Sequence, residues 1–130
     1  MTRLLPLLLA VMALACGDDP SGTEEPFEQT FTGNITALGT TSHTVTAPRG
    51  GTLRGVLTWP DGQVDLDLYL TEATCTGYPP SDCELLDSSD AFTGTQETVN
   101  GSVTTNQQRK LWVDSWSDEA SSYTIEVTID

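Results

Sequence analysis

Two aspartates in this sequence have the chemistry and the spacing to take part in a cation site. Asp65 and Asp67 alternate with leucines in Asp65-Leu-Asp-Leu-Tyr-Leu70, so both side chains are expected on one face of a strand. Hard cations such as calcium bind several oxygen ligands. Side chains two residues apart on a strand are separated by about 7 Å, so other groups must reach in before one calcium ion is held. The alternative is a solvated acidic face that keeps the protein soluble.

Two tryptophans have the spacing of a binding platform. Trp112 and Trp116 lie four residues apart, and Leu111 and Val113 occupy the opposite parity of the same expected strand. On an outer face, two indoles would form a surface for sugar rings or a protein partner. Alternatively, they cover the end of the barrel or the loop between Cys75 and Cys83. We assign Trp59 to the core.

Catalytic residue combinations are not evident. His43 is the only histidine, and it shares strand parity with Val45 and Ala47, which favours a partly buried structural role. The sequence has no Gly-x-Ser-x-Gly motif of the kind that exposes a nucleophilic serine. Without a nucleophile and an oriented base, we predict that the protein is not an enzyme.

The first sixteen residues predict export. Arg3 precedes an apolar run of about a dozen residues, which is shorter than the roughly 20 needed to span a bilayer but typical of a signal peptide. The run ends in Ala13-Leu-Ala-Cys16, which resembles the lipobox of bacterial lipoproteins, although Ala13 departs from the usual Leu, Val or Ile. The resemblance implies cleavage after residue 15 and a lipid on Cys16. The alternative is an ordinary secretory signal.

The remaining cysteines favour a disulfide. Lipid attachment to Cys16 leaves Cys75 and Cys83, which flank the turn-forming segment Thr-Gly-Tyr-Pro-Pro-Ser-Asp. In an oxidising compartment we expect these two to pair, and closing a loop of about nine residues contributes roughly 2–3 kcal/mol. A zinc site is a poor alternative, because two cysteines and one distant histidine fall short of four ligands.

Charge narrows the classes of partner. Five Lys and Arg residues against 19 Asp and Glu give a formal net charge of −14, which disfavours nucleic acid as a partner. There is also no basic patch for an anionic membrane surface. The 130 residues suffice for one domain, which we place at residues 27–130, after an acidic tether at residues 16–26.

Alternating hydrophobic and polar residues predict an all-β domain. The expected strands are followed by turn residues, including those at 48–51, 60–62 and 100–101. About seven to eight short strands at this spacing indicate an antiparallel sandwich or barrel. The segments with strand character are 27–35, 43–47, 52–59, 65–70, 95–103, 111–116 and 123–130.

Part of the chain resembles the bacterial pre-peptidase C-terminal domain. The stretch Gly51–Leu70, with its Asp-Leu-Asp-Leu-Tyr core, is similar to a strand, tight turn and strand of that family, and residues 110–127 are similar to its last two strands. The resemblance implies a jelly-roll-like β-sandwich, often found beside secreted proteases. Some members bind collagen or polysaccharide. Others bind calcium with ligands from before the first strand, which here points to Glu25 and Glu28. The insert between Cys75 and Cys83 departs from the family pattern.

These observations predict a non-catalytic, lipid-anchored envelope protein that binds a polysaccharide or an extracellular protein. The competing prediction is a structural or stabilising subunit for a separately encoded secreted protease or envelope complex. Gly17 rather than Asp follows Cys16, which disfavours inner-membrane retention and favours the outer membrane of the bacterial cell envelope. Calcium is the only candidate cofactor.

Overall fold

The structure is a computed structural model that describes residues 24–130. The predicted signal peptide (residues 1–15), Cys16 and most of the predicted tether lie outside the described residues. Within residues 24–130, no helix is long and apolar enough to cross a membrane.

The described chain forms eight strands, and together they account for all of its regular secondary structure. They lie close to the segments expected from alternation, with one addition, β5. In chain order they are β1 (Phe27–Ile35), β2 (Thr40–Thr46), β3 (Gly51–Thr58), β4 (Leu66–Glu72), β5 (Leu85–Ser89), β6 (Gln96–Val103), β7 (Gln108–Ser115) and β8 (Ser121–Ile129).

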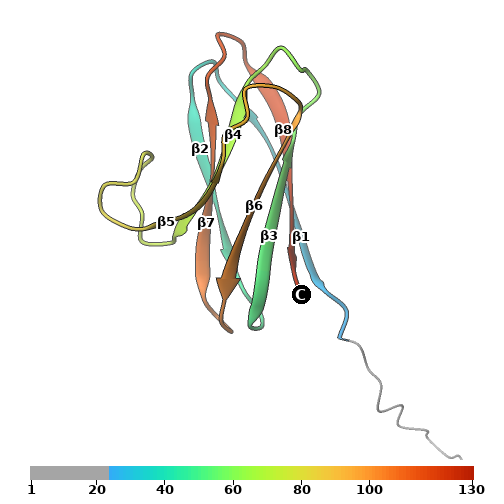
Figure 1. Ribbon diagram of the computed structural model, residues 1–130, viewed down its shortest axis with the longest axis vertical. Helices are drawn as coiled ribbons and strands as arrows, with labels where there is room; N and C mark the ends of the chain where they lie inside the picture. Colours follow the sequence, from blue (N-terminus) through green and yellow to red (C-terminus); the bar gives the residue numbers. More distant parts are fainter. Residues whose placement is uncertain (1–23) are drawn as a thin grey trace, which may run out of the picture.

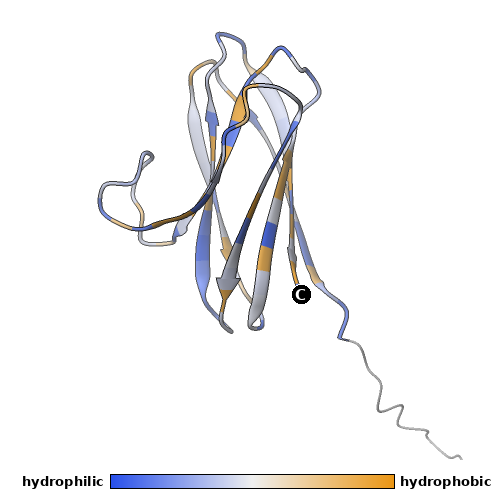
Figure 2. Cartoon of the chain, in the orientation of Figure 1, coloured by the Kyte–Doolittle hydropathy of each residue, from blue (hydrophilic) through white to orange (hydrophobic). Residues whose placement is uncertain are grey.

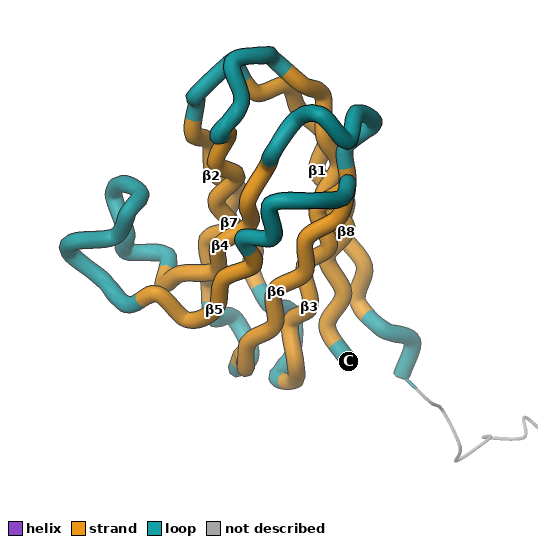
Figure 3. Tube along the Cα trace, turned by 45° about the horizontal axis from the view of Figure 1, so that its top comes forward, coloured by secondary structure: helices purple, strands orange, loops and turns teal. Residues whose placement is uncertain are grey.

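The strands form two antiparallel sheets that pack face to face (Figure 1). The first sheet has the order β1-β8-β3-β6 and the second the order β2-β7-β4-β5. The tube view shows that the connections between the strands are loops and turns (Figure 3). The predicted fold class, an all-β antiparallel sandwich, is therefore confirmed.

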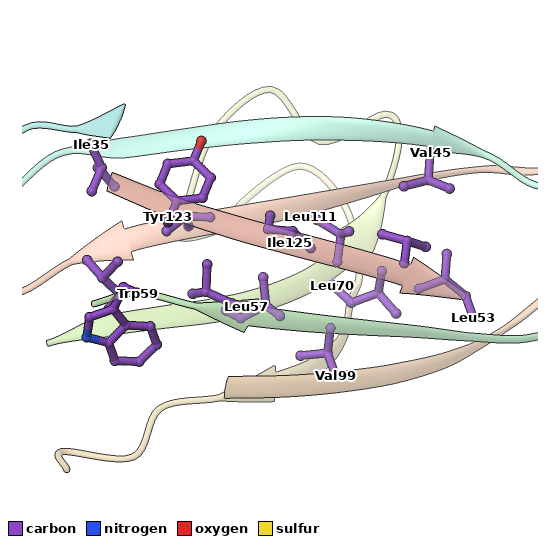
Figure 4. Packing of buried hydrophobic residues seen from close by; sticks show 14 of the residues in the cluster. Ile35, Val45, Leu53, Leu57, Trp59, Leu70, Val99, Leu111, Tyr123 and Ile125 are labelled. Carbon is purple, nitrogen blue, oxygen red and sulfur yellow. The ribbon is translucent and has the colours of Figure 1, made fainter. Parts of the chain in front are cut away.

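A single hydrophobic core fills the space between the sheets. Leu53 and Leu57 enter it from β3, and Leu66, Leu68 and Leu70 enter it from β4. Figure 4 shows core side chains from both sheets directed toward one another. Figure 2 shows hydrophobic and hydrophilic segments interspersed along the sandwich, and burial along β3 and β8 alternates with the strand period of two. Each of these leucines contributes about 1.5–3 kcal/mol by its burial.

The turn expected at residues 100–101 is absent, because Asn100 and Gly101 lie within β6. Gly101 pairs with Leu53 of β3, and its missing side chain leaves room for Leu70 of the opposite sheet. A Cβ atom on Gly101 would lie 2.6 Å from Leu70 Cδ2. The glycine therefore serves close packing between the sheets rather than chain reversal.

The two ends of the sandwich differ in what they carry. The loops at residues 36–39, 59–65, 90–95 and 116–120 gather at the upper end in Figure 1, which we call the loop end. There the Leu38 amide donates to the Ser117 carbonyl at 3.0 Å. The start of β1 and the C-terminus lie side by side at the opposite end, where Phe27 pairs with Ile129.

Candidate binding pocket

A pocket of about 310 Å³ lies at the loop end, on the outer face of the second sheet. It is formed around β4, with contributions from the segment that follows β7 and from the loop between β5 and β6. Its lining consists of three aspartates and three aromatic residues: Asp65, Asp67, Tyr69, Asp90, Phe92 and Trp116. We call this group the acidic–aromatic pocket.

Two of its aromatic side chains are directed to solvent. Phe92 is 90% exposed and Trp116 is 63% exposed, which is unusual for side chains of this size. The backbone of Trp116 is fixed, because its amide donates to the Asp65 carbonyl at 3.0 Å. Exposed aromatic groups beside a pocket mark a surface suited to a ligand.

Asp67 forms the buried acidic part of the pocket. Its residue surface is only 5% exposed, and the Tyr69 hydroxyl donates to Asp67 Oδ2 at 2.9 Å. Among residues 24–130, no hydrogen bond is made to the other carboxylate oxygen, Oδ1. Burial raises the pKa of Asp67 to about 6; the Tyr69 hydrogen bond opposes this shift, and the negative charges of Asp65, Asp90 and Glu97 add to it.

Further acids lie beside Asp67, one on β7 and one just after β5. Asp67 pairs with Asp114 of β7, and Asp90 follows Ser89, the residue that pairs with Leu68 of β4. Like charges on neighbouring strands lower stability. None of the described residues that line the pocket is basic. The arrangement therefore costs the fold stability and leaves a negative charge available to a ligand.

Glu97 of β6 holds the loop that carries Asp90 and Phe92. Its side chain is 3% exposed and accepts hydrogen bonds from the Ser89 hydroxyl and, at 3.0 Å, from the Ala91 amide. A buried carboxylate with two donors fixes the loop beside β4. No sequence motif contains Asp90, Phe92 or Glu97, so these three residues were not predicted as part of a site.

The disulfide predicted between Cys75 and Cys83 is present, with a Cα–Cα distance of 5.2 Å. The loop that it closes packs on the outer face of the second sheet, where the rings of Tyr78 and Tyr69 stack with centroids 4.0 Å apart. Such a bond is typical of proteins outside the cytoplasm.

Trp112 and Trp116 do not form the predicted platform of two exposed indoles; the alternative, cover by the disulfide loop, holds for Trp112. The two side chains do share a face, but Trp112 is only 7% exposed because it packs with Tyr69, Cys75 and the disulfide loop. Its indole Nε1 donates to the Thr71 hydroxyl at 2.9 Å. Lys110 lies over the same ring and donates to the Cys75 carbonyl at 2.6 Å. Phe92, rather than Trp112, is the second exposed aromatic residue at the pocket.

The four acids considered for calcium do not form one site. Asp65 and Asp67 lie in the pocket, whereas Glu28 lies near the start of β1 in the other sheet, with Glu25 just before that strand. From Glu28 to Ile35, which is at the loop end, β1 extends about 23 Å. Within residues 24–130, no group of three or more His, Cys, Asp or Glu side chains is arranged to hold a metal ion.

His43 has structural contacts, as its strand parity suggested. Its ring stacks on Phe31 with centroids 4.7 Å apart, and its Nε2 lies 2.7 Å from the Tyr123 hydroxyl. Burial lowers the pKa of His43, which favours the neutral imidazole. In Figure 4 the Tyr123 ring lies among the core residues with its hydroxyl directed toward β2, the strand of His43.

No protein-family model matches the sequence, and no curated protein matches it either. Solved structures do share the fold. The Yersinia pseudotuberculosis-derived mitogen superposes with a TM-score of 0.61 at 20% identity, covering 82% of this chain and 88% of that chain.

Two further structures are similar. The pre-peptidase C-terminal domain of a Bacillus anthracis collagenase has a TM-score of 0.58 at 13% identity, covering 77% of this chain and 88% of that one. A periplasmic inhibitor of g-type lysozyme from Aeromonas hydrophila has a TM-score of 0.53 at 15% identity, covering 79% and 86%. At these identities the likeness establishes a common fold, and the fold of a pre-peptidase C-terminal domain is among those shared.

Proposed function

We propose that this protein is a non-catalytic binding module, attached to the bacterial cell envelope through a lipid on Cys16, that captures a polysaccharide or an extracellular protein. The observation that carries the proposal is the acidic–aromatic pocket, where Phe92 and Trp116 are exposed beside a buried carboxylate. A large exposed aromatic surface lowers solubility and gives the fold little stability, so a binding role explains its presence.

The direction of the chain supports this role. The domain begins with β1 at the end opposite the loop end, so the segment from Cys16 to Pro26 joins the domain far from the pocket (Figure 1). An anchor at Cys16, placed in the outer membrane as Gly17 suggests, would therefore direct the pocket away from the lipid surface.

The similar structures also suit a binding module of the pre-peptidase C-terminal type. One is such a domain of a collagenase, and another is an inhibitor of g-type lysozyme. These two proteins suggest probes for a binding test: insoluble collagen and peptidoglycan as polymers, and g-type lysozyme as a protein.

The test is depletion of residues 17–130 from solution by insoluble peptidoglycan, chitin, cellulose and collagen, and co-precipitation with immobilised g-type lysozyme. This fragment contains the complete core between the two sheets. The double variant Phe92→Ala/Trp116→Ala should lose the binding. Leu38→Ala, which removes an exposed apolar side chain from another loop at the same end, should retain it. Retention of all binding by the double variant would refute the pocket as the binding surface.

The anchor is tested separately in the full chain. Cys16→Ser should move the protein from the membrane fraction to the soluble fraction, because a lipid on this residue is the proposed attachment. Continued membrane association of the variant would contradict the lipoprotein interpretation.

A further inference from the structure

We infer that the acidic–aromatic pocket accepts an arginine or lysine side chain presented by a basic protein partner. This inference rests on the proposed binding function and specifies its ligand. It is carried by three properties of the pocket: its charge, its exposed aromatic rings and its size.

The charge of the pocket is complementary to a cation. Asp65, Asp67 and Asp90 line it, and no basic residue is among its described lining residues. The Tyr69 hydroxyl donates to Asp67 Oδ2, and Asp67 Oδ1 accepts no hydrogen bond from residues 24–130. A guanidinium or ammonium group supplies hydrogen-bond donors, and charged hydrogen bonds of this kind are the strong ones. The net charge of −14 would also steer a basic protein toward the domain.

The aromatic rings suit the same ligand. Phe92 and Trp116 line the pocket with most of their surface exposed. A cation is attracted to the electron-rich face of an indole, and the planar guanidinium of arginine also stacks on aromatic rings. The aliphatic stem of arginine or lysine would cover part of the exposed ring surface.

The size of the pocket favours a side chain over a polymer. Its volume of about 310 Å³ is at the lower limit of the roughly 300–1,000 Å³ typical of small-molecule sites. A polysaccharide commonly contacts an extended surface, but the neighbouring outer face is occupied by the disulfide loop over Tyr69 and Trp112. The accessible part of this face therefore suits one anchoring side chain.

Binding of a cation should depend on pH in a defined direction. Burial and the negative charges of Asp65, Asp90 and Glu97 hold the pKa of Asp67 at about 6, and the Tyr69 hydroxyl acts in the opposite sense. Asp114 on β7 and Tyr78 of the disulfide loop are the other titratable groups beside Asp67. A bound cation favours the ionised carboxylate, so the affinity should increase as pH rises through 6.

The experiment titrates residues 17–130, labelled with ¹⁵N, with a tetra-arginine peptide and, separately, with a tetra-glutamate peptide and a chitin oligosaccharide. Nuclear magnetic resonance at about 0.1 M salt follows the indole of Trp116 and the amides of the pocket. Tetra-arginine should shift these signals, and Asp65→Asn/Asp90→Asn should weaken its binding by about tenfold or more.

A matched control separates the pocket from net charge. Glu28→Gln/Glu126→Gln removes two negative charges from the outer face of the other sheet and should change the affinity by less than about twofold. Equal weakening by both double variants would show non-specific attraction and overturn the inference.

Two other results would also overturn it. Depletion by a polymer that needs Trp116 but not Asp65 and Asp90, without any response to tetra-arginine, would support the proposed function and reject a cationic ligand. A response to calcium alone at the pocket aspartates would likewise reject a side-chain ligand. No response to any probe would count against both proposals.

Discussion

The outer faces of the two sheets differ in the residues they carry, although both sheets share one core. The first sheet has a shallow depression of about 580 Å³, whose lining includes Thr32, Thr58 and Thr124 and no charged residue. The second sheet carries buried Tyr69 and Trp112 beneath a disulfide loop, and beside them the acidic–aromatic pocket.

This difference distinguishes an outer face whose residues cost the fold little from one whose residues lower its stability or solubility. Hydroxyl side chains on an outer strand face satisfy their hydrogen bonds with water at little cost, so the first sheet needs no special explanation. Neighbouring acids such as Asp67 and Asp114, and an exposed Phe92, lower stability or solubility. The larger depression is therefore the weaker candidate, and the smaller pocket is the one whose composition calls for a ligand.

The largest effect should be common to both sheets. Leu57 of the first sheet and Leu68 of the second are fully buried in the same core, so replacing either by alanine should cost about 2–5 kcal/mol of unfolding free energy. Urea denaturation of each variant measures this cost. A near-zero cost at one position would break the picture of a single shared core.

The disulfide loop covers the outer face of the second sheet only, so its loss should change the environment of that face as well as the overall stability. Cys75→Ala/Cys83→Ala should lower the unfolding free energy by about 2–3 kcal/mol, because a closed loop of about nine residues restricts the unfolded chain. The loss should come with a red shift of Trp112 fluorescence, because in the parent protein the disulfide loop covers this indole. Trp59→Phe and Trp116→Phe in the same background isolate the Trp112 signal. Unchanged Trp112 emission would show that the loop packs without the covalent link.

The sequence predicted the sandwich because buried strands repeat a period of two. Alternation located β1, β3, β4 and β8 closely, and Trp112 and Trp116 both lie on the side of Tyr69. The exposure of Trp112 was not predictable in this way, because it depends on how the disulfide loop folds back over the sheet.

β5 and the pocket residues of the following loop were not predicted, because neither has a periodic pattern in the sequence. β5 is short and partly exposed, so it has no clear alternation of hydrophobic and polar residues. Asp90 and Phe92 belong to a loop, and their position depends on Glu97, a buried acid that contacts Ser89 and Ala91. Such contacts arise only when β5 and β6 are placed in the fold, so local sequence carries no signal for them.

Asp67 of the second sheet should make the unfolding free energy depend on pH. Folding raises its pKa from 3.8 to about 6, so the native state holds the proton more tightly than the unfolded chain. Stability from this group is therefore full below about pH 4 and is lost as pH rises through 6. Asp67→Asn keeps an acceptor for Tyr69 and should raise the unfolding free energy at pH 7 by about 1–2 kcal/mol relative to the parent.

Thermal unfolding between pH 4 and pH 8 measures this difference. The gain from Asp67→Asn should shrink toward zero at pH 4, where the parent carboxyl is protonated. Glu126→Gln, on the exposed outer face of the first sheet, is the matched control and should change stability by less than about 0.5 kcal/mol. A gain from Asp67→Asn that is the same at pH 4 and pH 8 would show that ionisation is not its cause.

The smallest effect on stability should accompany the largest effect on binding. Phe92→Ala and Trp116→Ala remove side chains that are mostly exposed, so each should change the unfolding free energy by less than about 0.5 kcal/mol, as should Thr32→Ala and Thr124→Ala on the other face. Denaturant unfolding and the pocket titration, run on the same four variants, separate the two faces. Only the aromatic pair should lose ligand, because the proposed binding surface lies on the second sheet. Destabilisation by Trp116→Ala well above 0.5 kcal/mol would instead make this side chain part of the packing.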